Sequence, residues 1–252
     1  MSCNGRRQLS STLCRGSSTR QFRRGVSRRT GGGGRQGRFQ PVSSCLAFGT
    51  GSGEHEIGFA RRLLPNLRSF TAVEPDPDSV EALRTSFRDG QLPGVETSVV
   101  ETSLESWNGV DSRVDAVLLF NVLGHVLAAD RDALLQKLTT RHLLSRAALV
   151  VVCVDDFSVP NGNVLLMERL GVPRVDYDEL EAEMLAAGFR VVFERALEIR
   201  LDYSNPSDDL VRFIQLMAEH KFSELEVRKT VDDIYSQPNL HTAKYKLAIF
   251  TK

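Results

Sequence analysis

A regular alternation of short apolar runs with amphipathic segments, beginning near residue 42, is the feature that most constrains the fold. The apolar runs have the length and residue types of buried strands, and the segments between them repeat apolar residues at helical spacing. Such alternation predicts an α/β fold, a doubly wound parallel sheet with helices on both faces. Strands are expected at 43–49, 68–76, 95–103, 113–123, 147–156, 190–201 and 243–252.

The helix boundaries carry recognisable signals. Helices are expected at 55–66 and 77–90, the second with Pro77 near its start and Gly90 at its end. A helix at 130–143 would have Asp130 as its N-cap. A further helix at 176–189 would end at Gly188. Helical patterns at 207–221 and 223–237 form an insert before the last strand. Two final strands separated by such an insert indicate an antiparallel edge of the sheet. The residues expected to face the core are Leu134, Leu135, Leu138, Leu180, Met184 and Leu185.

The charge of the chain is unevenly distributed. The formal net charge is +0, but residues 1–40 contain ten Arg and no acidic residue, so the remainder carries all 32 acids. That acidic body disfavours nucleic acid as a partner, and no apolar run reaches the roughly 18 residues of a membrane span. Residues 1–40 are expected to be a disordered Arg/Ser/Gly-rich arm, with the folded domain at 41–252. We expect a cytoplasmic monomer; the acid-free arm leaves a mitochondrial transit peptide as the alternative.

The first predicted strand ends in a glycine-rich loop, "FGTGSGE" (Phe48 to Glu54). Glycine lets a ligand approach the backbone closely, and the amides at the start of the next helix can then bind oxygen atoms. The glycines Gly49, Gly51 and Gly53 follow a G-x-G-x-G pattern. Glu54 stands where the dinucleotide fingerprint has its third glycine, and its charge would repel a pyrophosphate. A tight turn without a ligand is the alternative.

A second signal lies about twenty residues further on, where Glu74 ends the next strand in "AVEPD". An acid at this position can accept hydrogen bonds from the two hydroxyls of a ribose. An exposed strand-end carboxylate is the alternative. Taken together, the loop and the acid favour a ligand that contains adenosine.

With these motifs the chain resembles class I S-adenosylmethionine-dependent methyltransferases, which implies a seven-stranded Rossmann-like sheet. More narrowly, it is similar to the histamine N-methyltransferase family over 42–252, in "VEP", in the "ETS" of Glu101–Ser103, and in "VDAVLLFNVLGHV". The resemblance implies a cofactor, S-adenosyl-L-methionine, and a small-molecule amine as methyl acceptor. It implies no metal and no covalent nucleophile. The cofactor-binding positions that it implies are Gly49, Gly51, Gly53, Glu74, Ser79, Ser103 and Phe120.

The acceptor side departs from that family. Asn121 replaces a glutamine, and Gly124 and His125 replace an aromatic pair. Ala243 stands in place of a substrate-binding asparagine, and residues 1–40 offer no counterpart of the family's N-terminal helical segment. Asn121 and His125 are the candidate substrate residues, because they follow a strand at the crevice of the fold; for His125, a packed or capping role is the alternative.

Three functions remain open at this point. The first is a small-molecule N-methyltransferase, with a histamine-like amine or another small acceptor. The second is a protein of this fold that binds the cofactor without turnover, as the missing segment and Ala243 suggest. The third is a nicotinamide oxidoreductase, which Glu54 disfavours.

Overall fold

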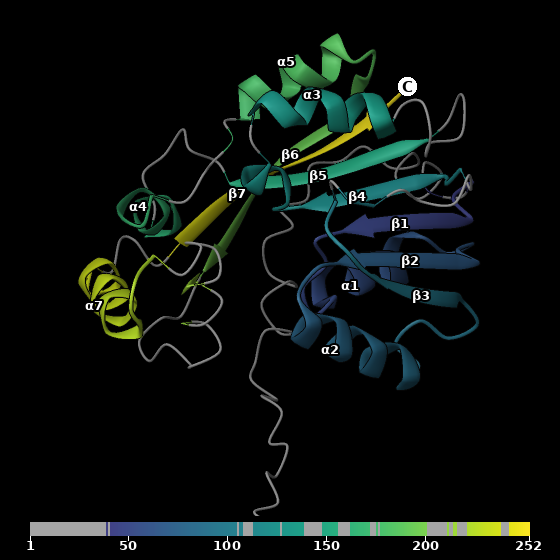
Figure 1. The fold of residues 1–252 in the computed structure, drawn as a ribbon. Coiled ribbons are helices and arrows are strands. Elements are labelled where there is room, and N and C mark those ends of the chain that lie inside the picture. Colours follow the sequence, from purple (N-terminus) through teal and green to yellow (C-terminus); the bar gives the residue numbers. More distant parts are fainter. Residues whose placement is uncertain are drawn as a thin grey trace, which may run out of the picture. The chain divides into compact units, whose positions relative to one another are not determined.

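The computed structural model describes residues 39, 41–104, 106–107, 113–126, 128–138, 148–155, 162–171, 175, 177–200, 211, 214–215, 221–237 and 242–252. Strands and helices alternate along the chain as the apolar pattern predicts (Figure 1). Their bounds are β1 Ser44–Phe48, α1 Glu54–Leu63, β2 Ser69–Glu74, α2 Pro77–Arg88, β3 Glu96–Glu101, β4 Ala116–Phe120, η2 Leu123–His125, α3 Ala128–Lys137, β5 Leu149–Asp155, α4 Gly162–Arg169, α5 Tyr177–Ala186, β6 Arg190–Arg200, α7 Glu224–Tyr235 and β7 Thr242–Thr251.

The strands form one seven-stranded sheet in the order β3-β2-β1-β4-β5-β7-β6. Strands β1 to β5 pair in parallel, and β7 runs antiparallel to both β5 and β6. The order reverses between β1 and β4, which creates a crevice at the carboxyl ends of these two strands. The predicted doubly wound sheet, with a helical insert before the last strand, is confirmed. The last two strands form the expected antiparallel edge, in which β7 lies inside the sheet and β6 is the outermost strand.

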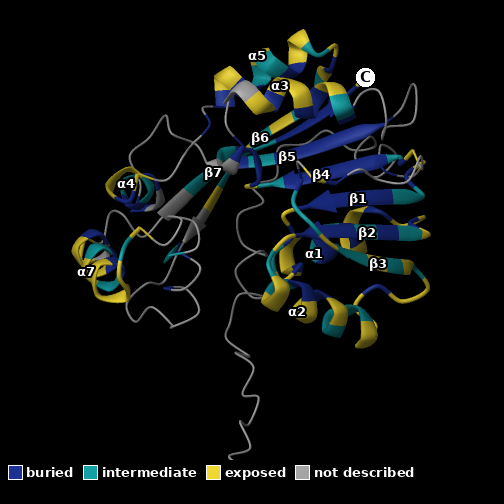
Figure 2. Ribbon diagram, in the orientation of Figure 1, coloured by how far each residue is buried: buried dark blue, intermediate teal, exposed yellow. Residues whose placement is uncertain are grey.

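Successive strand residues point to opposite faces of the sheet, and this separates the core into two layers. On one face, Leu46, Leu119 and Val152 pack with residues of α3 and α5. On the other face, Cys45 and Ala47 pack with residues of α1 and α2. Both layers are buried, as Figure 2 shows for the central strands. Burial on both faces explains why these strands read as continuous apolar runs.

The start of β1 is tied to β4 by the carboxylate of Asp115. Its Oδ2 accepts hydrogen bonds from the amides of Ser43 and Ser44, at 2.8 and 3.0 Å, and from both hydroxyls. Burial disfavours the charged form of Asp115, but the hydrogen bonds from Ser43 and Ser44 outweigh it and lower the pKa. This contact fixes the register of β1 beside β4, and with it the height at which the glycine loop leaves the sheet.

The insert shares an apolar cluster with helix α4. Helix α7 packs against α4, and α4 also contacts β7. The cluster contains Leu166, Leu170, Val211, Ile214, Val227, Val231 and Ile234. Helices α4 and α7 lie at the left of Figure 1, on the side to which the arrowheads of β1 and β4 point. Helix α7 begins with a capping box, in which Ser223 and Glu226 bond reciprocally.

Two details differ from the sequence expectation. Asp130 is not an N-cap, because α3 begins at Ala128 and includes Asp130 in its first turn. Leu185 does not face the core, since it is 49% exposed, whereas Leu180 and Met184 are fully buried. The apolar stripe of α5 is therefore narrower than predicted. Helix α4 was not predicted, and the expected helix at 207–221 falls largely outside the described residues.

The described residues belong to one compact unit, Gly33–Lys252. The expected arm, residues 1–40, lies almost entirely outside the described part, and so do Cys3 and Cys14. Phe39 is the exception: it is buried and packs edge-on against Phe59, with 5.7 Å between ring centroids. Among the described residues, no helix is long and apolar enough to cross a membrane.

Candidate functional site

Parallel pairing brings the predicted cofactor residues to one edge of the sheet. Gly49 follows β1 directly, Glu74 ends β2, and Phe120 ends β4. Ser103 follows β3 by two residues, and Glu74 is in register with Glu101 of that strand. Residues taken from four separate stretches of sequence thus meet at the carboxyl edge, where ligands bind in open α/β sheets.

The glycine loop has a backbone that other residues adopt rarely. Gly49, Gly51 and Gly53 have φ angles of 56°, 51° and 79°. A Cβ on Gly49 would lie 2.8 Å from Val122 Cγ2, and one on Gly53 would lie 2.4 Å from Leu83 Cδ2. A Cβ on Gly51 would meet no atom within 4 Å. The outer glycines are therefore required by packing, whereas Gly51 faces open space and is the position available to a ligand.

Glu74 fixes this loop from the neighbouring strand. Its Oε2 accepts a hydrogen bond from the amide of Gly51 at 2.8 Å, and its Oε1 accepts one from the amide of Asp76 at 3.0 Å. Burial raises the pKa of Glu74, although the amides of Asp76 and Gly51 oppose the shift. A carboxylate has about four acceptor positions, so two remain for ligand hydroxyls.

A second carboxyl, that of Glu56, lies behind the loop in the first turn of α1. It is only 3% exposed. Burial, together with the nearby charge of Glu74, raises its pKa to about 8, although a backbone hydrogen bond opposes the shift. Sequence analysis missed this residue, because an acid in the first turn of a helix usually faces solvent and complements the helix dipole.

Thr50 contributes a buried polar atom to the same loop. It is 5% exposed, and its Oγ1 has no hydrogen-bond partner. A buried hydroxyl without a partner costs free energy, and such groups are rare unless a ligand or water satisfies them. Together with the open face of Gly51, it indicates that the loop is built to contact a bound molecule.

One of the two predicted serines lies at the start of a helix, and the other follows strand β3. The amide of Ser79 donates to the N-cap residue Asp76 at 2.8 Å, so Ser79 lies in the first turn of α2. The hydroxyl of Ser103 accepts a hydrogen bond from the amide of Ser106 at 3.2 Å. Beyond Ser103, Trp107 packs its ring edge-on against Phe48, with 5.1 Å between centroids. Both serines are half-buried, consistent with positions at the rim of a site.

The acceptor candidates follow β4. Phe120 is half-buried and packs against Phe59, with 5.5 Å between ring centroids. Asn121 is exposed, with φ 57°, and its amide donates to the carbonyl of Cys153 at 2.7 Å. It is the only non-glycine among the described residues with a positive φ. Backbone strain of this kind concentrates at functional sites. His125 belongs to η2, and its side chain lies outside the described part, as does that of Ala243 in β7.

Within the described part of the chain, no group of three or more His, Cys, Asp or Glu side chains could hold a metal ion. Cys45 and Cys153 form no disulfide, and burial raises the pKa of Cys45 above its ordinary value. The Cys45 thiol is therefore not activated by its surroundings as a nucleophile would need to be.

Known proteins match this arrangement at the level of the domain and the fold. Residues 45–143 match the family described as "Methyltransferase domain". This match covers 99 of the 252 residues. The matched range contains the glycine loop, Glu74, Ser103 and the segment after β4. No curated protein sequence matches the chain.

Three solved structures illustrate the likeness in fold. A proposed methyltransferase from Bacillus halodurans C-125 is 12% identical, with a TM-score of 0.57, over 84% of this chain and 93% of its own. A proposed sarcosine dimethylglycine methyltransferase from Galdieria sulphuraria is 12% identical, with a TM-score of 0.55, over 85% and 80%. The mycolic acid cyclopropane synthase CmaA1, in complex with SAH and CTAB, is 11% identical, with a TM-score of 0.55, over 86% and 81%.

Proposed function

We propose that the protein is an S-adenosylmethionine-dependent N-methyltransferase whose acceptor is a small amine, with histamine-like amines as the first class to test. The observation that carries the proposal is the glycine loop at the tip of β1. There, Gly51 faces open space while its amide is held by the buried carboxylate of Glu74. The methyltransferase domain family that the chain matches implies this cofactor.

The residues at the carboxyl edge fit the cofactor in its separate parts. The loop around Gly51 would take the methionine part, and the unpartnered hydroxyl of Thr50 offers it a hydrogen-bond partner. The two acceptor positions left on Glu74 would take the ribose hydroxyls. Ser103 and Phe120, at the ends of β3 and β4, would border the adenosine.

The charge at the start of α1 favours a cationic cofactor over a dinucleotide. Glu54 lies in the first turn of this helix, where the dipole is positive. Its carboxylate compensates the dipole that a pyrophosphate would otherwise use. A sulfonium, in contrast, is stabilised by nearby carboxylates. The same argument disfavours a nicotinamide oxidoreductase.

The cofactor supplies an electrophilic methyl group, so the chain itself has to bind, orient and desolvate the acceptor. Such a displacement needs the nucleophilic nitrogen about 3 Å from the methyl carbon, and most of the rate gain comes from orientation. Asn121, exposed at the end of β4, is placed to orient an amine through its side-chain amide. His125, four residues on, is the candidate to accept the amine proton near neutral pH.

The amine is assigned from charge and from the residues after β4, because the fold serves different acceptors. One structural neighbour is a proposed sarcosine dimethylglycine methyltransferase, and another is a cyclopropane synthase of mycolic acids. Residues 41–252 contain all 32 acids of the chain and 22 basic residues, so they attract cations. A protonated amine would be concentrated at this surface and would lose its proton at the site.

The cofactor is tested first, by calorimetric titration with S-adenosylmethionine, S-adenosylhomocysteine and NADH. We expect both adenosyl compounds to bind and NADH to give no heat. Glu74→Gln should weaken binding at least tenfold, because it removes a charged acceptor worth about 1.5–3 kcal/mol. Glu101→Gln is the matched control, since it makes the same change one strand over, in register with Glu74.

Turnover is tested next, with methyl-labelled cofactor and a panel of biogenic amines that includes histamine. Alcohols, thiols and carboxylic acids of similar size serve as the comparison. Methyl transfer to one or more amines, and to none of the others, is the expected result. Cofactor binding without transfer to any compound would instead favour a binding protein, and failure to bind the cofactor would refute both.

A further inference from the structure

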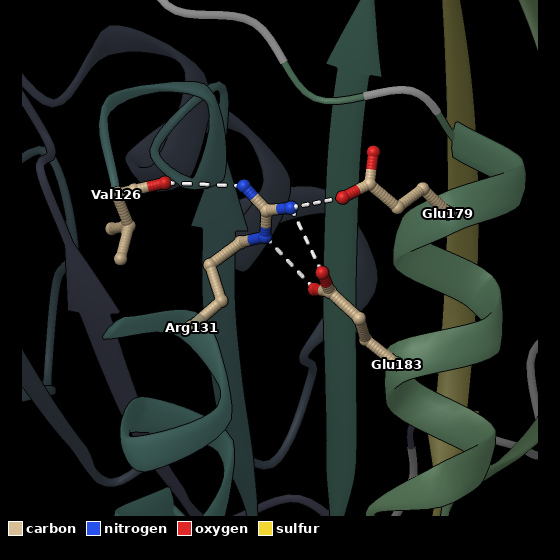
Figure 3. A network of polar contacts seen from close by, with 4 residues as sticks. All are labelled: Val126, Arg131, Glu179 and Glu183. Atoms are coloured by element: carbon tan, nitrogen blue, oxygen red, sulfur yellow. Dashed lines mark hydrogen bonds and ion pairs between the residues drawn. The ribbon is translucent and has the colours of Figure 1, made fainter. Parts of the chain in front are cut away.

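Arg131 of α3 is a buried guanidinium away from the glycine loop, and Figure 3 shows that it joins three segments. Its Nε and Nη2 donate to the two carboxylate oxygens of Glu183, both at 2.8 Å. Nη2 also donates to Oε1 of Glu179 at 2.8 Å. Nη1 donates to the backbone carbonyl of Val126 at 3.2 Å. Arg131 thus connects helix α5 to the residue that follows η2.

Several hydrogen bonds fix the position of the Arg131 guanidinium. Arg131 is 4% exposed, and a buried charge is tolerated only when it is paired and hydrogen-bonded. Glu183 binds it in the two-pronged arrangement that sets both distance and plane. Hydrogen bonding to Glu183, together with the charges of Glu183 and Glu179, raises the pKa of Arg131, so the guanidinium remains charged. The position of Nη1, and therefore of the Val126 carbonyl, is fixed by α5.

Val126 lies in the segment that leads from β4 toward α3, of which residues 121–126 are described. At the other end of the segment, the amide of Asn121 donates to Cys153 at 2.7 Å. Between these two points, the Val122 side chain approaches the glycine loop so closely that a Cβ on Gly49 would lie 2.8 Å away. The segment therefore touches the cofactor loop, carries both acceptor candidates, and is anchored at its far end by Arg131.

We infer that Arg131, held by Glu183 and Glu179, is a positioning residue that sets the orientation of the acceptor-binding segment 121–126 by fixing the carbonyl of Val126. The inference rests on the proposed function for its kinetic consequence. Loss of the contact alters how the acceptor is presented, while the cofactor contacts at Gly51 and Glu74 persist. None of the described residues that hydrogen-bond to Arg131 belongs to the glycine loop.

The test compares three variants in the full chain. Arg131→Lys keeps the charge but cannot make the two-pronged contact. The double variant Arg131→Leu/Glu183→Leu removes the buried pair, a change that often preserves stability, and leaves the Val126 carbonyl without its donor. Arg88→Lys is the matched control, because Arg88 pairs with Glu81 at 2.7 Å on the exposed face of α2.

Three readouts are measured on each variant: acceptor KM, affinity for S-adenosylhomocysteine, and amide hydrogen exchange. In both Arg131 variants we expect acceptor KM to rise about tenfold, which corresponds to the loss of one charge-assisted hydrogen bond. The affinity for S-adenosylhomocysteine should stay within about twofold of that of the wild type. Amides of residues 121–126 should exchange about tenfold faster, while those of β1 and β2 stay unchanged. Arg88→Lys should match wild type throughout.

A structural role alone would give a different pattern. Acceptor KM would then stay at its wild-type value while the amount of active protein fell, and the double variant would recover wild-type behaviour. Either result, or unchanged exchange in residues 121–126, would overturn the inference. If the wild-type protein binds cofactor but methylates no amine, the proposed function fails separately, and the exchange comparison still decides whether Arg131 fixes the segment.

Discussion

Replacing Gly53 by Ala should destabilise the protein by an amount that the structure allows us to work out. At φ 79°, the left-handed backbone costs a residue with a Cβ about 1–2 kcal/mol. The new Cβ would lie 2.4 Å from Leu83 Cδ2 and 3.0 Å from Ile57 Cδ1, an overlap that costs about 1–3 kcal/mol in a packed core. The expected loss in the free energy of unfolding is therefore about 2–5 kcal/mol.

Gly90→Ala separates the two contributions. Gly90 has φ 71°, close to that of Gly53, but a Cβ there meets no atom within 4 Å. This variant should lose only the backbone part, about 1–2 kcal/mol. Ala also lowers the conformational entropy of the unfolded chain, which stabilises both variants by the same amount. This contribution cancels when the two variants are compared. The difference of about 1–3 kcal/mol measures the packing of the loop against Leu83 and Ile57.

The assay is urea unfolding followed by circular dichroism and by the fluorescence of Trp107, the only tryptophan. A domain of this size loses about 2–4 °C in Tm per kcal/mol, so thermal unfolding gives an independent check. Equal losses in the two variants would refute the reasoning, because the contact with Leu83 would then carry no energy. So would a Gly53→Ala protein that unfolds within about 0.5 kcal/mol of wild type.

Three further outcomes are expected. Gly51→Ala should lose as little stability as Gly90→Ala, yet bind S-adenosylhomocysteine at least tenfold more weakly by calorimetry, because its Cβ occupies the open face of the loop. The pKa of Glu56 is raised from 4.5 to about 8, so the unfolded state binds fewer protons in this range and stability should fall as pH rises from about 4.5 to 8. Urea titrations at several pH values should show this slope flattened by Glu56→Gln and kept by Glu54→Gln, a change at an exposed position of the same helix. Asn121→Gly should unfold at the same or a higher temperature, since glycine relieves the strain at φ 57°, while acceptor KM rises about tenfold.

Each of these outcomes can fail on its own. Unchanged cofactor affinity in Gly51→Ala would mean that the cofactor does not bind against the glycine loop. A pH slope that persists in Glu56→Gln would assign the slope to another group. Normal acceptor kinetics in Asn121→Gly would remove this side chain from the acceptor site.

The sequence predicted most of the fold because its signals are local. Apolar runs, Pro77 and Gly188 are each read within one element, and the order of elements then restricts the sheet to a few topologies. The position of β7 between β5 and β6 depends on pairing between distant segments, which no local pattern records. Leu185 was misplaced because the width of a buried stripe depends on the neighbour that covers it.

The candidate site was predicted in the same uneven way. Gly51 and Glu74 were predicted because a ligand requires them at a fixed spacing. The structure joins them by a hydrogen bond of 2.8 Å, and their part in cofactor binding stays a prediction. Glu56 was missed because its burial follows from how α1 packs behind the loop. Arg131 was missed because its partners lie 48 and 52 residues further along the chain. Both are charged residues on helices, and sequence alone assigns such residues to solvent.

The inner position of β7 means that the sheet is not assembled in the order of the chain. Strands β5 and β6 do not pair with each other, and each pairs with β7. A polypeptide cut before Thr242 would expose two unsatisfied strand edges at once, in the middle of an otherwise finished sheet. Unpaired strand edges of this kind form hydrogen bonds with strands of other molecules and so promote aggregation. Proteolytic fragments that lack this hairpin partner should therefore precipitate rather than persist as a smaller, partly active protein.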